Sequence, residues 1–317
     1  MIAAKAFGNY PRAFVVQRKG ENLMKMKSSK AKLIGLCFVL PALIIYTVFQ
    51  IVPLIGAFYF SFADWNGLAG SPINFVGLRN YTAIFKDSLF ILSLKNMAKM
   101  VIISVLLHTP IALLMAVALS GKTKATRAFK AIYFVPTVFP LTAIGLLWYF
   151  IFMPNGSLNS LLQMIGLGQL QMAWLVEKEV AMNTIIFVNI WAGVGYYMVI
   201  LMAGLTTISE DVYEAAQIDG ASPIQRFFHI TVPLLKPIIS MCIVMDIIGS
   251  VKVFDLVFAM TGGGPNGLTN LPTTLMYQEA FRYDHYGLGS AIGIVIMVIC
   301  LTGTIISEAI TAKRKEE

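Results

Sequence analysis

Six long runs of apolar residues, separated by polar segments, dominate the pattern along this chain. A membrane-crossing helix needs roughly 20 mostly apolar residues, because lipid offers no partner for backbone N–H and C=O groups. The pattern therefore predicts an all-α integral membrane protein. We expect a six-helix transmembrane domain over residues 33–311, an N-terminal tail over 1–32 and a C-terminal tail over 312–317. The runs cover approximately residues 33–60, 96–119, 129–152, 181–205, 234–260 and 288–310.

Composition supports a membrane protein and argues against the soluble classes. Of the 317 residues, 57% are hydrophobic and 13% are charged, whereas an ordinary soluble domain has about 25% charged residues. The net charge of +8 does not indicate nucleic-acid binding, because the basic residues cluster beside the apolar runs. Cys37, Cys242 and Cys300 lie in apolar runs without metal-like spacing to a histidine, so we expect free, buried thiols.

The positions of lysine and arginine predict the orientation of the spans. Cytoplasmic segments of membrane proteins carry an excess of these residues. The tail of residues 1–32, the loop of residues 120–128 and the end of the chain after residue 312 are all basic. With six crossings these segments fall on one side, so both termini are expected in the cytoplasm. The basic residues between positions 79 and 99 fit this rule less well.

The polar segment of residues 207–237, between the fourth and fifth runs, contains paired start and stop signals for helices. Ser209 can cap a helix with an acidic first turn, and Gly220 supplies the left-handed residue that ends it. Ser222 and Gln225 then form a possible capping box around a proline in the first turn. We therefore expect two short helices around a sharp turn at the cytoplasmic face, rather than a plain solvated connector.

Small side chains occupy the middle of this segment, where another protein's surface could approach the backbone closely. Glu214 adds one charge for a basic partner, and an amphipathic helix in a groove is the expected mode of docking. Pro233 and Pro237 are expected to turn the chain back into the fifth span. The segment thus predicts a docking surface for another protein.

The same segment resembles the coupling loop of permeases in binding-protein-dependent ABC importers. The shared pattern is Glu-Ala-Ala, three residues, Gly-Ala, an aromatic residue, isoleucine and two prolines. The resemblance implies the type I importer permease fold, in which this loop docks in a cleft of a cytoplasmic ATPase and transmits nucleotide-driven closure to the spans. It also implies a location in the inner membrane of a bacterial cell. The matching positions are Glu214, Ala215, Ala216, Asp219, Gly220, Ala221, Phe227, Ile230, Pro233 and Pro237.

Further segments resemble carbohydrate permeases of the maltose type: FADWNG at residues 62–67, FVGLRNY at 75–81 and VFDLVFAMTGGGP at 253–265. This resemblance implies that an extracellular or periplasmic solute-binding protein delivers a sugar or oligosaccharide. It also implies a second homologous permease subunit, forming a heterodimer, and two cytoplasmic ATP-binding subunits that use ATP and Mg²⁺. The segment of residues 253–265, followed by Thr269, Tyr277 and Phe281, would face the binding protein.

Unusual polar and aromatic residues in the fourth and fifth spans are candidates for a solute cavity near mid-membrane. In the fourth span these are Asn189, Trp191, Gly193 and Tyr196, where an amide and rings could hydrogen-bond to a sugar and stack on it. Asn189 and Gly193 share one helix face and match cavity positions of the resembled family. The alternative is that Trp191 and Tyr196 merely pack between helices.

In the fifth span, Asp246, Gly249, Ser250 and Val253 recur at helical spacing and form one stripe. A carboxylate inside a span rarely faces lipid, so Asp246 is expected to face the protein interior or the cavity. It could accept hydrogen bonds from sugar hydroxyls, pair with a cation, or belong to a structural ion pair. Lys252 and Asp255, three residues apart, are expected to neutralise each other outside the solute site.

No segment has the pattern of a catalytic site. The nearest match to a phosphate-binding loop, residues 116–123, lacks the first glycine and follows a helix, so ATP hydrolysis is expected on separate chains and no cofactor on this one. One alternative is an ion-coupled transporter that uses Asp246 and Lys252 in a charge relay, and another is an intramembrane enzyme acting on lipid-linked sugars. Residues 156–168 predict a short amphipathic helix on the outer surface, and Gly289 and Gly293 predict a close helix contact.

Overall fold

The computed structural model describes residues 28–121 and 123–313. Most of the two predicted tails therefore lies outside the described residues. Within the described part, six helices are long and apolar enough to cross a membrane, which confirms the predicted fold class. The chain divides into two compact units, Met1–Gly56 and Ala57–Glu317. The candidate spans are Ile34–Phe60, Ser88–Ala118, Leu141–Met164, Ala181–Leu205, Pro223–Val251 and Tyr286–Ile305.

The first helical segment consists of α1 (Ser28–Tyr46), a π turn η1 (Thr47–Ile51) and α2 (Val52–Phe60). The π turn lies directly before Val52 and Pro53. A proline has no N–H to donate, and a local π turn lets the carbonyls before it find other donors, so the helix continues.

The second unit consists of helices with one very small sheet. The sheet has two antiparallel strands, β1 (Ala63–Asp64) and β2 (Asn74–Phe75). Its longer helices are α4 (Ser88–Ala118), α5 (Lys124–Val138), α6 (Leu141–Phe152), α8 (Ala181–Leu205), α11 (Val232–Val251) and α14 (Tyr286–Lys313). The shorter elements are α3 (Arg79–Lys86), α7 (Ser157–Met164), η2 (Gly168–Leu170), α9 (Glu210–Ile218), α10 (Pro223–Arg226), η3 (Phe227–Thr231), α12 (Asp255–Met260), α13 (Pro272–Tyr277) and η4 (Gln278–Arg282).

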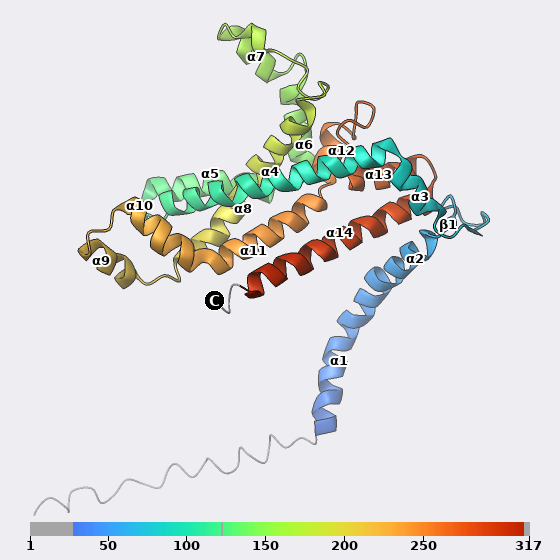
Figure 1. The fold of residues 1–317 in the computed structure, drawn as a ribbon, viewed down its shortest axis with the longest axis horizontal. Helices are drawn as coiled ribbons and strands as arrows, with labels where there is room; N and C mark the ends of the chain where they lie inside the picture. Colours follow the sequence, from blue (N-terminus) through green and yellow to red (C-terminus); the bar gives the residue numbers. More distant parts are fainter. Residues whose placement is uncertain (1–27, 122, 314–317) are drawn as a thin grey trace, which may run out of the picture. The chain divides into compact units, whose positions relative to one another are not determined.

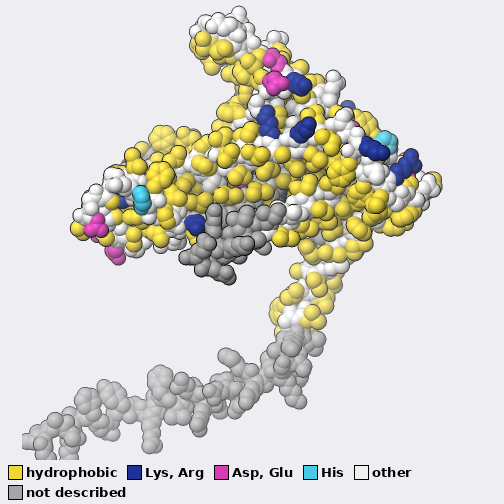
Figure 2. Space-filling view, in the orientation of Figure 1, with side chains coloured by type: hydrophobic (Ala, Val, Ile, Leu, Met, Phe, Trp, Pro, Cys, Tyr) yellow, Lys and Arg dark blue, Asp and Glu magenta, His cyan; other side chains and the backbone are white. Residues whose placement is uncertain are grey.

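The helices α4, α11 and α14 run side by side, as Figure 1 shows, and α8 packs against α4 and α5. The short helices α9 and α10 lie at one end of this bundle, whereas α3, α12 and α13 lie at the other. The face in Figure 2 is largely hydrophobic between these two ends. Two buried clusters form the core, one around Phe90, Met100 and Leu256 and one around Met198 and Leu235.

Two of the predicted spans are interrupted. The run of residues 129–152 breaks between α5 and α6, because Pro140 has no N–H and forces Phe139 into extended backbone. Within the run of residues 234–260, the helix α11 ends at Val251, and α12 begins as a separate helix at Asp255. Apolar composition alone does not reveal these breaks, since both halves of each run are hydrophobic.

The second helix begins earlier than predicted, at Ser88 instead of residue 96. The Asp87 carboxylate accepts a hydrogen bond from the Leu89 N–H at 2.9 Å and so caps the helix at this point. Lys95 and Lys99 therefore lie well inside α4. The predicted run began after Lys95, although residues 89–92 and 94 are also apolar.

Other local predictions have clear outcomes. The predicted amphipathic helix is α7, and it begins at Ser157. A Cβ at Gly289 would lie 2.6 Å from the Ala280 Cβ, which confirms the close approach of α14 to a neighbouring segment. The three cysteines are free thiols, as predicted, but only Cys242 is buried. Cys37 is exposed and Cys300 half-buried on this chain, so the prediction of burial was wrong for these two.

Candidate functional site

The segment of residues 207–237 forms the two predicted short helices, α9 and α10. Gly220 has φ of +78°, the left-handed conformation that the sequence required of it. Ser222 and Gln225 form the capping box, with the Ser222 N–H donating to Gln225 Oε1 at 2.8 Å and the Gln225 N–H donating to Ser222 Oγ at 3.3 Å. Ser209 occupies the predicted N-cap position, but its side chain makes no capping hydrogen bond.

Pro233 and Pro237 do not turn the chain, contrary to the prediction. The path from α10 continues through the π turn η3 into α11, and both prolines lie within α11. As at Pro53, the π turn stands directly before a Val-Pro pair and lets the chain remain helical without the missing N–H. One uninterrupted helical path therefore joins the turn at Gly220 to the fifth span.

The surface of this segment is exposed and partly apolar. Neither α9 nor α10 has a buried residue. Of the residues matched to the coupling loop, Glu214, Ala215, Asp219, Gly220 and Pro233 are exposed, and Ala216, Ala221 and Phe227 are half-buried. Ile218 and Ile224 are 87% and 71% exposed. Such exposed isoleucines at a helix turn are typical of a surface that another protein covers.

A hydrogen bond within this segment holds α9 against η3. The hydroxyl groups of Tyr213 on α9 and Thr231 on η3 lie 3.0 Å apart. Thr231 itself is buried. The first short helix is thereby tied to the base of α11.

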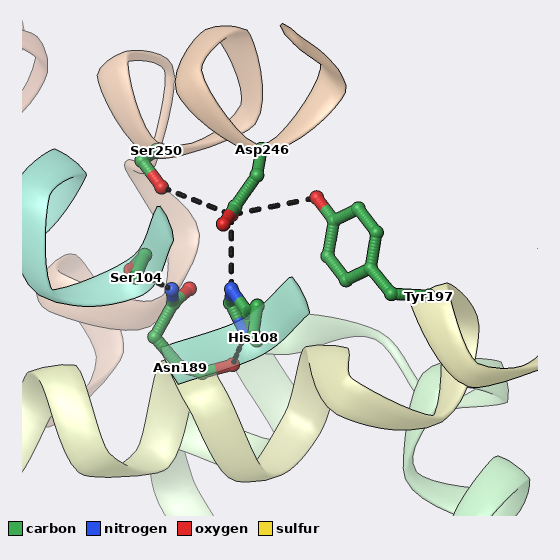
Figure 3. A network of polar contacts seen from close by, with 6 residues as sticks. All are labelled: Ser104, His108, Asn189, Tyr197, Asp246 and Ser250. Atoms are coloured by element: carbon green, nitrogen blue, oxygen red, sulfur yellow. Dashed lines mark hydrogen bonds and ion pairs between the residues drawn. The ribbon is translucent and has the colours of Figure 1, made fainter. Parts of the chain in front are cut away.

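Asp246 lies in a buried polar network between three spans, shown in Figure 3. Its side chain is buried, and its Oδ1 lies 2.9 Å from Nδ1 of His108 on α4. The hydroxyl groups of Tyr197 on α8 and Ser250 on α11 donate to the same oxygen, each at 3.4 Å. Asp246 therefore faces the protein interior, as predicted, and its partner is a histidine that the sequence reasoning did not assign.

Both ring nitrogens of His108 face oxygen acceptors. Its Nε2 lies 3.3 Å from the backbone carbonyl oxygen of Asn189, which can only accept. A neutral imidazole donates from one nitrogen, whereas the imidazolium donates from both, so the charged form satisfies both contacts. The contact between His108 Nδ1 and Asp246 Oδ1 joins α4 to α11 inside the bundle, and it is an ion pair when the ring is protonated.

Gly193 provides the space that the His108 ring occupies. A Cβ at this position would lie 2.8 Å from His108 Nε2. Asn189, one turn earlier on α8, donates from its side-chain amide to Ser104 Oγ on α4 at 3.2 Å. Asn189 and Gly193, which were predicted to share one face of the fourth span, thus both contact side chains of α4.

The structure separates the predicted cavity residues into two groups. Asn189, Gly193, Asp246 and Ser250 meet in the buried network, and the nearby Val253 is buried at the end of α11. Trp191 and Tyr196 are 37% and 44% exposed on this chain, and Gly249 is exposed with nothing within 4 Å of its Cβ position. Trp191 also packs edge-on against Trp148 at 5.3 Å between ring centroids, so helix packing explains part of its placement.

Three members of the network were missed: Ser104, His108 and Tyr197. One signal in the sequence pointed to His108, since a carboxylate inside a span needs a partner and this histidine lies within another apolar run. Lys252, in contrast, ends α11, and Asp255 begins α12. Among the described residues no ion pair joins Lys252 to Asp255 or to Asp246, so the predicted neutralisation was wrong.

At the other end of the bundle, a polar network shapes the loop that follows α12. The side-chain amide of Asn96 donates to the backbone oxygens of Leu268 and Asn270 at 2.9 and 3.0 Å. The Thr269 hydroxyl, which is buried, donates to the Gly264 carbonyl at 2.8 Å. The aromatic rings of Phe258, Tyr277 and Phe281 contact one another beside this loop. Within the described residues there is no cluster of side chains that could hold a metal ion.

Comparisons with known proteins place this arrangement in a family. The family model described as "Binding-protein-dependent transport system inner membrane component" matches residues 108–316. The chain is 36% identical to a probable ABC transporter permease protein, YurN, of Bacillus subtilis, over 90% of this chain and 98% of the relative. It is 34% identical to the trehalose/maltose transport system permease protein MalF of Thermococcus litoralis, over 89% of this chain and 94% of that one.

A solved structure has the same fold. It belongs to a bacterial ABC transporter involved in the import of the acidic polysaccharide alginate. The TM-score is 0.79, with 23% sequence identity, and the match covers 90% of this chain and 96% of the other.

Proposed function

This chain belongs to the family of binding-protein-dependent transport system inner membrane components, and we propose that the cargo it conducts is a sugar or oligosaccharide. The chain is a multi-pass, non-catalytic permease subunit of an ATP-driven importer. The carbohydrate assignment rests on its 34% identity to a trehalose/maltose permease. It fits the polar and aromatic side chains of α8 and α11.

Residues 207–237 form the coupling segment, which docks in a groove of a cytoplasmic ATP-binding subunit. The observation that carries this assignment is an exposed surface, with Ile218 and Ile224 87% and 71% exposed, held by a capping box and a left-handed glycine. A segment that needed only to connect two spans would not expose large apolar side chains in so ordered a turn. ATP and Mg²⁺ are used by two such subunits, and this chain binds no cofactor.

The solute path follows the exposed side of α8 and α11. Trp191 and Tyr196 offer rings for stacking, and Gly249 leaves open space on the neighbouring helix. The buried Asp246 carboxylate has a second oxygen, Oδ2, without a hydrogen-bond partner in the described part of the chain. We assign it as an acceptor for a sugar hydroxyl once α8 and α11 move apart, with His108 holding the carboxylate in position.

The two ends of the bundle are assigned to different partners. The coupling segment and both termini lie in the cytoplasm, and the loop after α12, with the exposed rings of Phe258 and Phe281, faces the external binding protein. A second homologous permease subunit completes the path, since Trp191 and Gly249 lie on surfaces that this chain leaves open.

A charge reversal on the coupling segment tests the central assignment. In the reconstituted importer, Glu214→Lys should abolish sugar uptake while the external binding protein still binds the complex. The matched control is Asp211→Lys, which makes the same charge change on the same helix outside the matched positions. Uptake by Glu214→Lys equal to that of Asp211→Lys would remove the docking role.

A further inference from the structure

A cavity of about 980 Å³ lies between the coupling segment and the ends of the spans above it. Its wall combines the end of α4, the first turns of α5, the end of α8, and α9, α10 and η3. Figure 1 shows these elements together at the end of the bundle that carries α9 and α10. The solute path described above lies elsewhere, because no residue of the Asp246 network lines this cavity.

The charged side chains that line the cavity are mainly basic. Arg127 and Lys130 of α5 face it from one side and Arg226 of α10 from another, with Glu210 as the acidic residue among them. Three cationic groups around one space attract an anion. Thr206 and Tyr213 add hydroxyl groups to the same wall.

Arg226 is held in this wall with unused hydrogen-bonding capacity. Its Nε is buried and has no partner in the described part of the chain. Its one hydrogen bond there runs from Nη1 to Gln217 Oε1 at 3.5 Å, which is long for a charged donor. A guanidinium group with free N–H donors is well suited to phosphate, which accepts two parallel hydrogen bonds.

The rest of the wall is apolar and continues onto a hydrophobic surface. Val117, Met202 and Leu205 line the cavity beside the basic groups. Farther along the same face of α5, three and four residues beyond Lys130, Tyr133 and Phe134 are 43% and 38% exposed, so an apolar surface leads away from the cavity along this helix. A basic pocket at the ends of transmembrane helices, next to exposed apolar side chains, matches the two parts of a phospholipid.

We propose that this cavity binds the phosphate group of an anionic phospholipid from the cytoplasmic leaflet. Arg226 and Arg127 hold the phosphate, Lys130 adds charge, and the acyl chains lie along α5. The bound lipid then joins α5 to α10 and fixes the coupling segment against the spans. The position of the cavity at the cytoplasmic leaflet rests on the proposed function.

Lipid retention by the assembled importer tests this site. The complete complex is purified, exchanged into phosphatidylcholine nanodiscs with increasing phosphatidylglycerol, and the bound phosphatidylglycerol is counted by native mass spectrometry. Arg226→Gln and Arg127→Gln should each weaken retention by roughly tenfold, the size expected for losing one charged hydrogen bond. The matched control is Lys124→Gln, which removes a charge from an exposed residue of α5 outside the cavity wall.

Two further measurements distinguish a lipid phosphate from a free phosphate compound and test the site itself. Soluble glycerol 1-phosphate at millimolar concentration should not displace the lipid, and displacement would mean that the cavity binds a free phosphate compound instead. Equal retention by wild type, Arg226→Gln and Arg127→Gln would overturn the site itself. Because Arg127 is exposed, its variant remains informative if Arg226→Gln does not assemble. The uncoupled Glu214→Lys complex should keep its lipid, so loss of coupling and loss of the lipid site are distinguishable.

Discussion

Replacing His108 by leucine removes the ring nitrogen that contacts the Asp246 carboxylate inside the bundle. The two groups are 3% and 2% exposed and lie 2.9 Å apart, so the remaining carboxylate would stay buried with only two long contacts of 3.4 Å. Removing one partner of a buried ion pair costs about 3–5 kcal/mol. For a domain of this size each kcal/mol lowers the melting temperature by about 2–4 °C. His108→Leu should therefore melt roughly 6–20 °C below wild type.

The double variant distinguishes an ion pair from simple packing. With His108→Leu and Asp246→Leu together no charge is left in the network, and replacing a buried pair by apolar side chains is often neutral or stabilising by about 1–4 kcal/mol. The double variant should thus be more stable than His108→Leu alone. Thermal unfolding of the solubilised complex is followed by tryptophan fluorescence for the four proteins of this double-mutant cycle: wild type, His108→Leu, Asp246→Leu and the double variant.

An exposed histidine serves as the control for this cycle. His285 lies outside the coupling segment, its side chain is 63% exposed, and its contact with Glu279 is a surface pair, so His285→Leu should change stability by less than about 1 kcal/mol. The stabilising role of the contact between His108 and Asp246 is refuted if His108→Leu melts within about 2 °C of wild type. It is refuted equally if the effects of the two single leucine variants simply add.

Two further substitutions test the space and the chemistry around this network. Gly193→Ala places a methyl group 2.8 Å from His108 Nε2 and should cost about 1–3 kcal/mol, whereas Gly249→Ala enters open space and should be neutral or stabilising by up to about 1 kcal/mol; equal melting temperatures would contradict the close packing of His108. Asp246→Asn keeps the shape but removes the charge, and it should alter the sugar selectivity or the transport-stimulated ATPase activity of the reconstituted importer; an unchanged profile in both assays would leave Asp246 with a structural role only.

Local chemistry explains which parts of the coupling segment could be predicted. Gly220 ends a helix because a left-handed residue costs glycine little, and Ser222 begins the next because its side chain reaches a nearby N–H. Both effects involve residues within four positions of each other. The same holds for the apolar runs, which had to be helical in lipid whatever their neighbours.

The buried network could not be derived in this way. His108 and Asp246 are 138 positions apart, and their contact depends on how α4 and α11 pack. The break before Pro140 was visible as a proline, but prolines are also tolerated inside spans, as Pro110 in α4 and Pro237 in α11 show. Whether a helix breaks or continues depends on whether other donors replace the missing N–H, and that is decided by tertiary structure.

The π turn η3 has a mechanical consequence for the importer. The elements α10, η3 and α11 form one continuous helix. Phe227 and Asp246 therefore lie about 28 Å apart along a single helix axis. The extra residue of a π turn rotates everything before it by about 100° around that axis. The angular position of the α10 surface relative to the Asp246 carboxylate is therefore set within five residues. Under the proposed docking of residues 207–237 on an ATP-binding subunit, a displacement of α10 would be carried along this continuous helix towards Asp246.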